Sequence, residues 1–188
     1  MSERALRLFA ALELPPEAVT RLARFPLDTE IWRPVAPESL HVTLAFLGAT
    51  EPAAVPALTA ALDAGVGTAR AAPPLAFAGP LLVPPRRPRV LAIALADPDG
   101  VLAGLQARVA GALAATGHYA PERRAFRPHV TVAPLRPRAR APRSVDATLE
   151  PLAFTGTAVT LFSSRTSPHG ARYEPLTTIP LRTGRTAD

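Results

Sequence analysis

The chain has 188 residues, enough to bury a hydrophobic core in one domain or in two small lobes that share an interface. It has no cysteine, which excludes disulfides, thiolate nucleophiles and Cys-ligated metal sites. No apolar run approaches the roughly 20 residues of a membrane-spanning helix, and the N-terminal apolar stretch is short and lacks the cleavage site of a signal peptide. We therefore expect a soluble, cytoplasmic protein without a membrane partner.

The chain is strongly basic, with a net charge of +6, and every one of its 21 basic residues is arginine. The guanidinium group is a planar, permanently charged fork that matches the oxygens of a phosphate. The excess of arginine therefore indicates a phosphate-bearing ligand. A coding bias toward arginine explains the lack of lysine equally well, so the composition indicates a class of ligand and nothing narrower.

In the first half of the chain, the patterns predict two strands that alternate with two helices. Each helix begins with a proline and an acid in its first turn, and glycines at 65 and 67 are expected to end the second helix. In chain order the expected elements are a strand at 5–14, a helix at 15–23, a strand at 40–47 and a helix at 50–62.

The second half contains more strands than helices. One helix has a clear apolar stripe and potential N-terminal caps at Asp97 and Asp99. The expected elements are strands at 75–83 and 89–96, the helix at 101–113, a strand at 126–135, a basic loop at 136–143, and a hairpin of strands at 152–164 and 172–181. This pattern predicts an α+β fold, and we expect residues 1–188 to form one domain of two lobes.

One seven-residue segment occurs twice. Residues 41–47 read HVTLAFL and residues 129–135 read HVTVAPL, each on an expected strand. Because side chains alternate along a strand, the His and the Thr of each copy share a face and lie about 7 Å apart. The duplication indicates a pseudo-symmetric fold in which His41 and His129 face a common cleft. The alternative is that both are ordinary strand histidines without a shared role.

Two facing imidazoles suit the hydrolysis of a cyclic phosphodiester. This reaction needs a base to deprotonate water on one side of the phosphorus and an acid to protonate the departing oxygen on the other. Histidine can serve in both roles at neutral pH because its ordinary pKa is about 6.5. The hydroxyls of Thr43 and Thr131 can donate to the non-bridging oxygens. The residues alone do not show which histidine is the acid.

The motifs and their surroundings resemble the RNA 2',3'-cyclic phosphodiesterases, formerly called 2'-5' RNA ligases, within the two-histidine phosphoesterases. The two His-x-Thr-x motifs are the signature of that family. The similar segments span most of the chain, at 7–15, 36–48, 87–95, 126–135 and 172–176. The resemblance implies a bilobal, pseudo-symmetric α+β fold with two antiparallel sheets lining a central cleft and helices outside. It also implies no metal, no cofactor and a product with a terminal 2'-phosphate.

The resemblance implies roles for the two histidines as well: His41 would be the proton donor and His129 the proton acceptor that activates water. One residue departs from the family. Relatives commonly have Arg where this chain has Pro134, so a phosphate contact is missing or is supplied elsewhere, for instance by Arg127 or Arg136. A proline also lacks an N–H group, which fits an edge strand or a strand end.

Other residues are weaker candidates for substrate binding. Arg127 shares the face of His129 and fits a phosphate contact or simple exposure equally well. Phe46 is a candidate for stacking on a base, but strict alternation places it opposite His41 and favours a core position unless the strand bulges. Phe9 and Tyr173 are further candidates, mainly on the basis of the resemblance.

The remaining histidines and the basic runs favour ordinary surface positions. His118 follows a helix end and His169 lies in an SPHG turn, and we expect both to be exposed. The arginine runs at 86–89 and 136–143 are typical of solvated loops, although they could follow an RNA backbone. The sequence has no phosphate-binding glycine loop, no zinc motif and no nucleophilic serine motif.

The leading hypothesis is a metal-independent enzyme that hydrolyses RNA 2',3'-cyclic phosphate ends to terminal 2'-phosphates. Its expected partner is RNA with such an end, or a cyclic nucleotide, and we expect a monomer. One alternative keeps the site but changes the reaction, to 2'-5' RNA ligation or to hydrolysis of a non-RNA cyclic phosphate. Another is a non-catalytic RNA-binding module, which would bind RNA in a salt-sensitive way without turnover.

Overall fold

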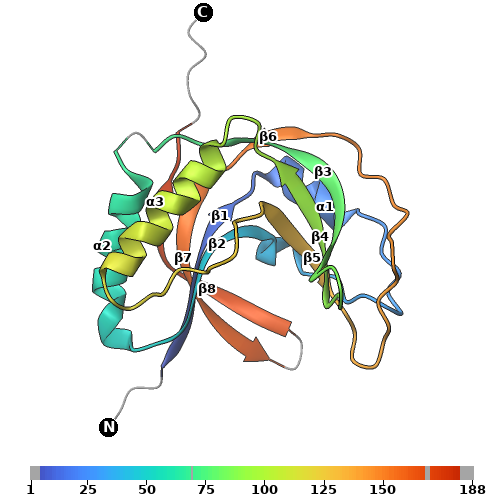
Figure 1. The fold of residues 1–188 in the computed structure, drawn as a ribbon, viewed down its shortest axis with the longest axis horizontal. Helices are drawn as coiled ribbons and strands as arrows, with labels where there is room; N and C mark the ends of the chain where they lie inside the picture. The colour runs from blue at the N-terminus through green and yellow to red at the C-terminus, as the bar shows by residue number, and fades with distance from the viewer. Residues whose placement is uncertain (1–4, 69, 168–169, 183–188) are drawn as a thin grey trace, which may run out of the picture.

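The computed structural model describes residues 5–68, 70–167 and 170–182, in which eight strands form two antiparallel sheets (Figure 1). The first sheet, in strand order, consists of β2 (His41–Thr50), β1 (Leu6–Glu13), β7 (Ala158–Ser167) and β8 (Gly170–Pro180). The second sheet consists of β5 (His129–Pro134), β4 (Val90–Ala96), β3 (Pro74–Val83) and β6 (Ala153–Thr155). The expected α+β fold of two lobes with two antiparallel sheets is confirmed.

Helices lie outside the sheets. They are α1 (Pro16–Ala23), α2 (Val55–Val66) and α3 (Val101–Ala115), with two short 3-10 helices, η1 (Pro37–Ser39) and η2 (Pro52–Ala54). Figure 1 shows α2 and α3 together on one side of the first sheet, and α1 on the side of the second sheet. Within the described residues, no helix combines the length and the apolar character needed to cross a bilayer.

The two lobes repeat one arrangement. In the first lobe the chain runs from β1 through α1 to β2, and in the second it runs from β4 through α3 to β5. Both second strands, β2 and β5, lie at an edge of their sheet. These edge strands begin with His41 and His129, so the duplicated segment occupies equivalent places in the two lobes.

A segment before β2 joins the two lobes. The backbone N–H of Val35 donates to the carbonyl of Val132 (2.9 Å), and that of Arg33 donates to the carbonyl of Pro134 (3.0 Å). This segment thereby covers the edge of β5 and leads, a few residues later, into β2. Pro134 ends β5 at the edge of its sheet, as its missing N–H group predicts.

The hydrophobic core fixes which face of each sheet remains available for a site. In β1 the side chains of Leu8, Ala10 and Leu12 belong to the core, and in β4 Leu91 and Ile93 do. Because side chains alternate along a strand, the intervening residues of β1 and β4 point to the opposite face. That opposite face is shared with His41 of β2, which pairs with Glu13, and with His129 of β5, which pairs with Ala94.

Two expected boundaries were wrong for reasons of packing. Gly65 lies inside α2 rather than beyond its end, because α2 approaches α3 so closely there that a Cβ would be 2.8 Å from the Cα of Val109. The expected strand at 152–164 is divided between the sheets. The division falls at Gly156, where a Cβ would be 2.5 Å from the Cδ1 of Leu12, and the chain crosses from one lobe to the other.

Most other expected elements agree with the structure, and one expected strand is too long. Asp97 caps α3, since its carboxylate accepts hydrogen bonds from the backbone N–H groups of Leu102 (3.1 Å) and Ala103 (2.8 Å). β7 and β8 form the expected hairpin. The expected strand at 126–135 is shorter, because regular pairing begins only at His129.

Candidate active site

The two histidines are held in the same way. The Nδ1 atom of His41 lies 2.7 Å from the carbonyl oxygen of Ser39, and that of His129 lies 2.7 Å from the carbonyl oxygen of Arg127. A ring nitrogen at this distance from a carbonyl must donate, so each Nδ1 carries a hydrogen. The Nε2 atom of a neutral ring is then left with its lone pair. Both imidazoles therefore present the nitrogen that can accept or return a proton.

Both motif strands contain a bulge at the same position. In β2, Ala10 pairs with Ala45 and Ala11 pairs with Thr43, so Leu44 is an extra residue. In β5 the register shift leaves Val132 as the extra residue in the same way. A bulge turns the residues that follow it by one position relative to strict alternation. The repeat thus extends beyond the letters of the motif to its backbone geometry.

The bulges place a third side chain beside each His and Thr. We call the face that carries the two histidines the histidine face. On it Phe46 follows His41 and Thr43 in β2, while Leu44 and Ala45 are both buried. Phe46 is 45% exposed, so the core position that strict alternation favours was wrong. Pro134 occupies the equivalent place in β5.

His41 lies among aromatic rings. The centroid of its ring is 4.9 Å from that of Phe9 and 5.4 Å from that of Tyr173. Phe162 stacks on Phe9 at 5.2 Å and lies 6.5 Å from His41. Burial lowers the pKa of His41 below 6.5, the hydrogen bond to Ser39 partly offsets this, and the charge of His129 lowers the pKa further. The strands that carry the two imidazoles, β2 and β5, contact each other.

The motif threonines stand opposite small residues. Thr43 pairs with Ala11 and Thr131 pairs with Ala92, so neither hydroxyl faces a large side chain across the strands. The Oγ1 of Thr43 lies 3.1 Å from the Nε2 of His41. Since Nδ1 of that ring already donates to a carbonyl, the threonine hydroxyl donates to Nε2 in the neutral ring.

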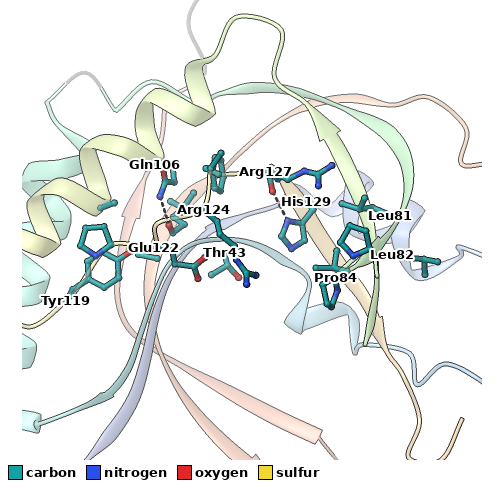
Figure 2. Close-up of a pocket in the computed structure, with 18 residues that line it drawn as sticks. Thr43, Leu81, Leu82, Pro84, Gln106, Tyr119, Glu122, Arg124, Arg127 and His129 are labelled. Atoms are coloured by element: carbon teal, nitrogen blue, oxygen red, sulfur yellow. Dashed lines mark hydrogen bonds between the residues drawn. The ribbon is translucent and has the colours of Figure 1, made fainter. Parts of the chain in front are cut away.

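A cavity of about 440 Å³ opens beside the motifs (Figure 2). Thr43 from the first lobe and His129 from the second both line it, so the two motifs meet at one site. Most of its wall is apolar and comes from the end of β3, from α3 and from the segment 116–128 that joins α3 to β5. The polar and charged residues that line it, besides Thr43 and His129, are Gln106, Tyr119, Glu122, Arg124 and Arg127.

Comparison with known protein families assigns the chain to one of them. The sequence profile of the 2'-5' RNA ligase superfamily matches residues 12–168 of the chain. The chain belongs to this superfamily. Comparison with curated protein sequences gives no significant match.

Solved structures of similar fold support the superfamily assignment. Escherichia coli LigT in its apo form is 26% identical, with a TM-score of 0.74, and the match covers 97% of this chain and 100% of LigT. The Thermus thermophilus protein TT0787 is 28% identical, with a TM-score of 0.74 and coverage of 94% and 98%. A protein described as a phosphoesterase is 27% identical, with a TM-score of 0.76 and coverage of 96% and 99%.

The substrate-binding candidates of this superfamily member lie in different environments. Phe9 is only 4% exposed and packs against the ring of His41. The ring of Phe46 is exposed to solvent, and the guanidinium of Arg7 lies 5.1 Å from its centroid. Tyr173 contacts His41 edge-on. Arg127 lines the cavity beside His129.

Arg136 does not reach the site. It follows the far end of β5, and its Nε donates to the carbonyl of Thr29. His118 is exposed, as expected, and His169 lies outside the described residues. In the part of the chain that the structure describes, no group of three or more acidic, histidine or cysteine side chains is arranged to hold a metal ion.

Three residues near the site were not predicted. Phe162 joins the aromatic cluster because β7 pairs with β1, a long-range pairing that no local pattern indicates. Gln106 of α3 donates to the carbonyl of Leu44 (3.1 Å) and so holds the bulge of β2 (Figure 2). The one sequence feature that could have indicated this role is that Gln106 is a polar residue beside the apolar stripe of the helix. Arg124 lines the cavity from a segment without regular structure, so its place followed from no periodic pattern.

Proposed function

We propose that this superfamily member hydrolyses the 2',3'-cyclic phosphate ends of RNA to terminal 2'-phosphates, with His41 and His129 as the acid/base pair. The observation that carries the proposal is the matched presentation of the two imidazoles. Each begins an edge strand and donates its Nδ1 hydrogen to the carbonyl two residues earlier, and one cavity is lined by His129 of one motif and by Thr43, the hydrogen-bond partner of His41, of the other.

The proposed reaction is an in-line displacement at phosphorus. His129 accepts a proton from water through Nε2, the water oxygen bonds to phosphorus, and the bond from phosphorus to O3' breaks. His41 donates a proton from Nε2 to O3', so the product carries a 2'-phosphate and a 3'-hydroxyl. The next turnover requires only that a proton pass from His129 back to His41 through solvent. The hydroxyls of Thr43 and Thr131 donate to the non-bridging oxygens, where negative charge grows as water adds.

The environment of His41 suits an acid that takes up its proton when the substrate binds. In the free protein its lowered pKa favours the neutral ring. A phosphodiester anion between the rings favours the protonated form, because an opposite charge nearby raises the pKa of an imidazole. His41 would then take up its proton as the substrate binds. A buried acid of this kind also gives up its proton readily.

Relatives support a nucleotide-like ligand. E. coli LigT has been solved in complex with 3'-AMP (28% identical to this chain), with phosphate (26%) and with ATP (25%). The net charge of +6 and the exposed arginines of the loops at 84–89 and 135–143 would also attract an RNA strand.

The decisive experiment uses purified protein and a short RNA with a 2',3'-cyclic phosphate end, in the presence of EDTA. We expect turnover without metal, and phosphorus NMR should identify the product as a 2'-phosphate. The double variant His41→Ala, His129→Ala prepared in parallel is the control for contaminating nucleases. Salt-sensitive RNA binding without turnover would contradict the proposal and favour a binding module.

The superfamily, named after 2'-5' RNA ligase, also makes RNA ligation a candidate reaction. Ligation uses the same site, with the 5'-hydroxyl of a second RNA in place of water. Adding such an acceptor to the same assay separates the two reactions, since ligation lengthens the RNA and hydrolysis does not. A 2'-5'-linked product in excess of the hydrolysed one would make ligation the main activity.

A further inference from the structure

The histidine face lacks a permanent positive charge where a phosphate would bind. In β2 and β5 it carries His41 and His129, the two threonines, and then Phe46 and Pro134. The paired positions of β1 and β4 contribute two ionisable side chains: Glu13, which pairs with His41, and Arg7, which pairs with Ala49 toward the other end of β1 and has its guanidinium over the ring of Phe46. Because Arg7 is held over Phe46, an arginine placed beside the two histidines has to come from outside β1, β2, β4 and β5.

Two arginines of the segment 116–128 reach the site. Of the described residues that line the cavity with Thr43 and His129, Arg124 and Arg127 are the arginines. Figure 2 shows Arg124 extending toward the space between Thr43 and His129, whereas Arg127 extends away from Thr43. No hydrogen bond or ion pair formed within the described part of the chain holds the guanidinium of Arg124.

The other nearby arginines are occupied or distant. Arg7 lies over the ring of Phe46, and Arg136 is bonded to the carbonyl of Thr29 beyond the end of β5. Arg123 is exposed and is not among the residues that line the cavity. Arg124 is therefore the arginine whose position and lack of other partners fit an anion placed between the two motifs.

We propose that Arg124 binds the phosphate group that lies between His41 and His129, with its guanidinium fork on two non-bridging oxygens. The fork geometry matches a tetrahedral phosphate, and a charge-assisted pair of this kind is stronger than a neutral hydrogen bond. The identity of the physiological substrate rests on the function proposed above, but the anion site itself does not. Glu122 lines the same cavity, and its carboxylate opposes anion binding.

The first test uses inorganic phosphate as the probe, so that it needs no turnover. Phosphate is titrated into wild-type protein by calorimetry, and the imidazole NMR signals of His41 and His129 report whether it binds between them. We expect Arg124→Ala to weaken binding by about 10- to 100-fold. Arg124→Lys should recover part of the loss because it keeps the charge but not the fork, and Glu122→Gln should bind phosphate more tightly.

The matched control is Arg123→Ala, which removes one charge next to Arg124 but outside the cavity. It should change phosphate affinity by about twofold at most, as expected for an exposed charge. Equal losses in both variants would show that only net charge matters and would overturn the proposal. So would wild-type affinity in Arg124→Ala, or wild-type protein that binds no phosphate at the histidines. Circular dichroism checks that every variant is folded.

A second test moves the charge to another place on the same site. Pro134 lies on the histidine face, so Pro134→Arg in the Arg124→Ala background should restore part of the phosphate affinity.

A third test is kinetic: Arg124→Ala should raise KM for cyclic-phosphate RNA by a larger factor than it lowers kcat. If phosphate binding depends on Arg124 while cyclic phosphates are not cleaved, the proposed function fails and the anion site stands. If cleavage proceeds with unchanged KM in Arg124→Ala, the anion site fails alone.

Discussion

The two motif strands have the same backbone geometry, but their histidines lie in different environments. β2 and β5 share the edge position, the bulge, and the hydrogen bond from Nδ1 of the histidine to a carbonyl. His41, however, packs against Phe9 and Tyr173 and has its Nε2 bonded to Thr43, whereas His129 lines an open cavity.

This difference shows how a duplicated strand can supply two unlike groups. The repeated backbone determines where the two nitrogens point, and the surrounding side chains determine how readily each ring holds a proton. Burial lowers the pKa of His41, and two imidazoles in unlike environments are suited to opposite roles in acid/base catalysis. The asymmetry between the lobes is therefore as much a part of the site as their symmetry.

The largest expected effect comes from removing either imidazole. His41→Ala and His129→Ala should each lower kcat on a cyclic-phosphate RNA by about 10²- to 10⁴-fold, because each removes one proton transfer. Steady-state rates against wild type measure this. The two variants should differ on a p-nitrophenyl phosphodiester, whose leaving group departs without a proton.

On that second substrate, His41→Ala should retain most of the wild-type rate and His129→Ala should remain impaired. The opposite pattern would reverse the acid and base roles. Full activity of either variant on the cyclic phosphate would remove the acid/base pair altogether. His118→Ala is the matched control, since this histidine is exposed and is not among the described residues that line the cavity.

The threonines give the next largest effect. Thr43→Val and Thr131→Val remove one hydroxyl each at nearly constant shape, and each should lower kcat/KM by about 10- to 100-fold if the hydroxyl donates to a charged oxygen. Thr43→Val should cost more, because it also removes the hydrogen bond to His41. Equal, small losses in the two variants would show that the threonines act through packing.

Phe46 and Pro134 allow a comparison at one equivalent position. Phe46→Ala should raise KM for RNA of several nucleotides by about fivefold or more, because an exposed ring on this face can stack on a base. Pro134→Ala should leave KM within about twofold, since proline offers no aromatic face. A KM unchanged in Phe46→Ala would leave the exposed ring without a role in RNA binding.

The smallest expected effect concerns stability and pH. The pKa of His41 is lowered in the folded protein, so below pH 6.5 the unfolded chain binds a proton that the folded one resists. The free energy of unfolding should therefore fall as the pH drops below 6.5, by at most about 1.4 kcal/mol per pH unit from this group. Urea denaturation at pH 7.5 and 5.5 measures the fall, which should be smaller in His41→Gln than in wild type or in His118→Gln.

Local patterns predicted the strands, the helices and the duplicated segment, because hydrophobic periodicity and caps act within a few residues. They placed Phe46 in the core, since the extra residue at Leu44 is defined only by the pairing of β2 with β1. Phe162 and Arg124 were missed for a related reason. One reaches the site through a strand paired across the chain, and the other through a segment without regular structure.

The short segment that covers the edge of β5 has a further consequence. Its bonds at Val35 and Arg33 attach it to the second lobe, and His41 of the first lobe follows only a few positions after Val35. The gap between the imidazoles is therefore spanned by a brief stretch of covalent chain, which acts as a built-in spacer. A change in the length of this stretch would alter that gap while leaving every residue of both motifs in place.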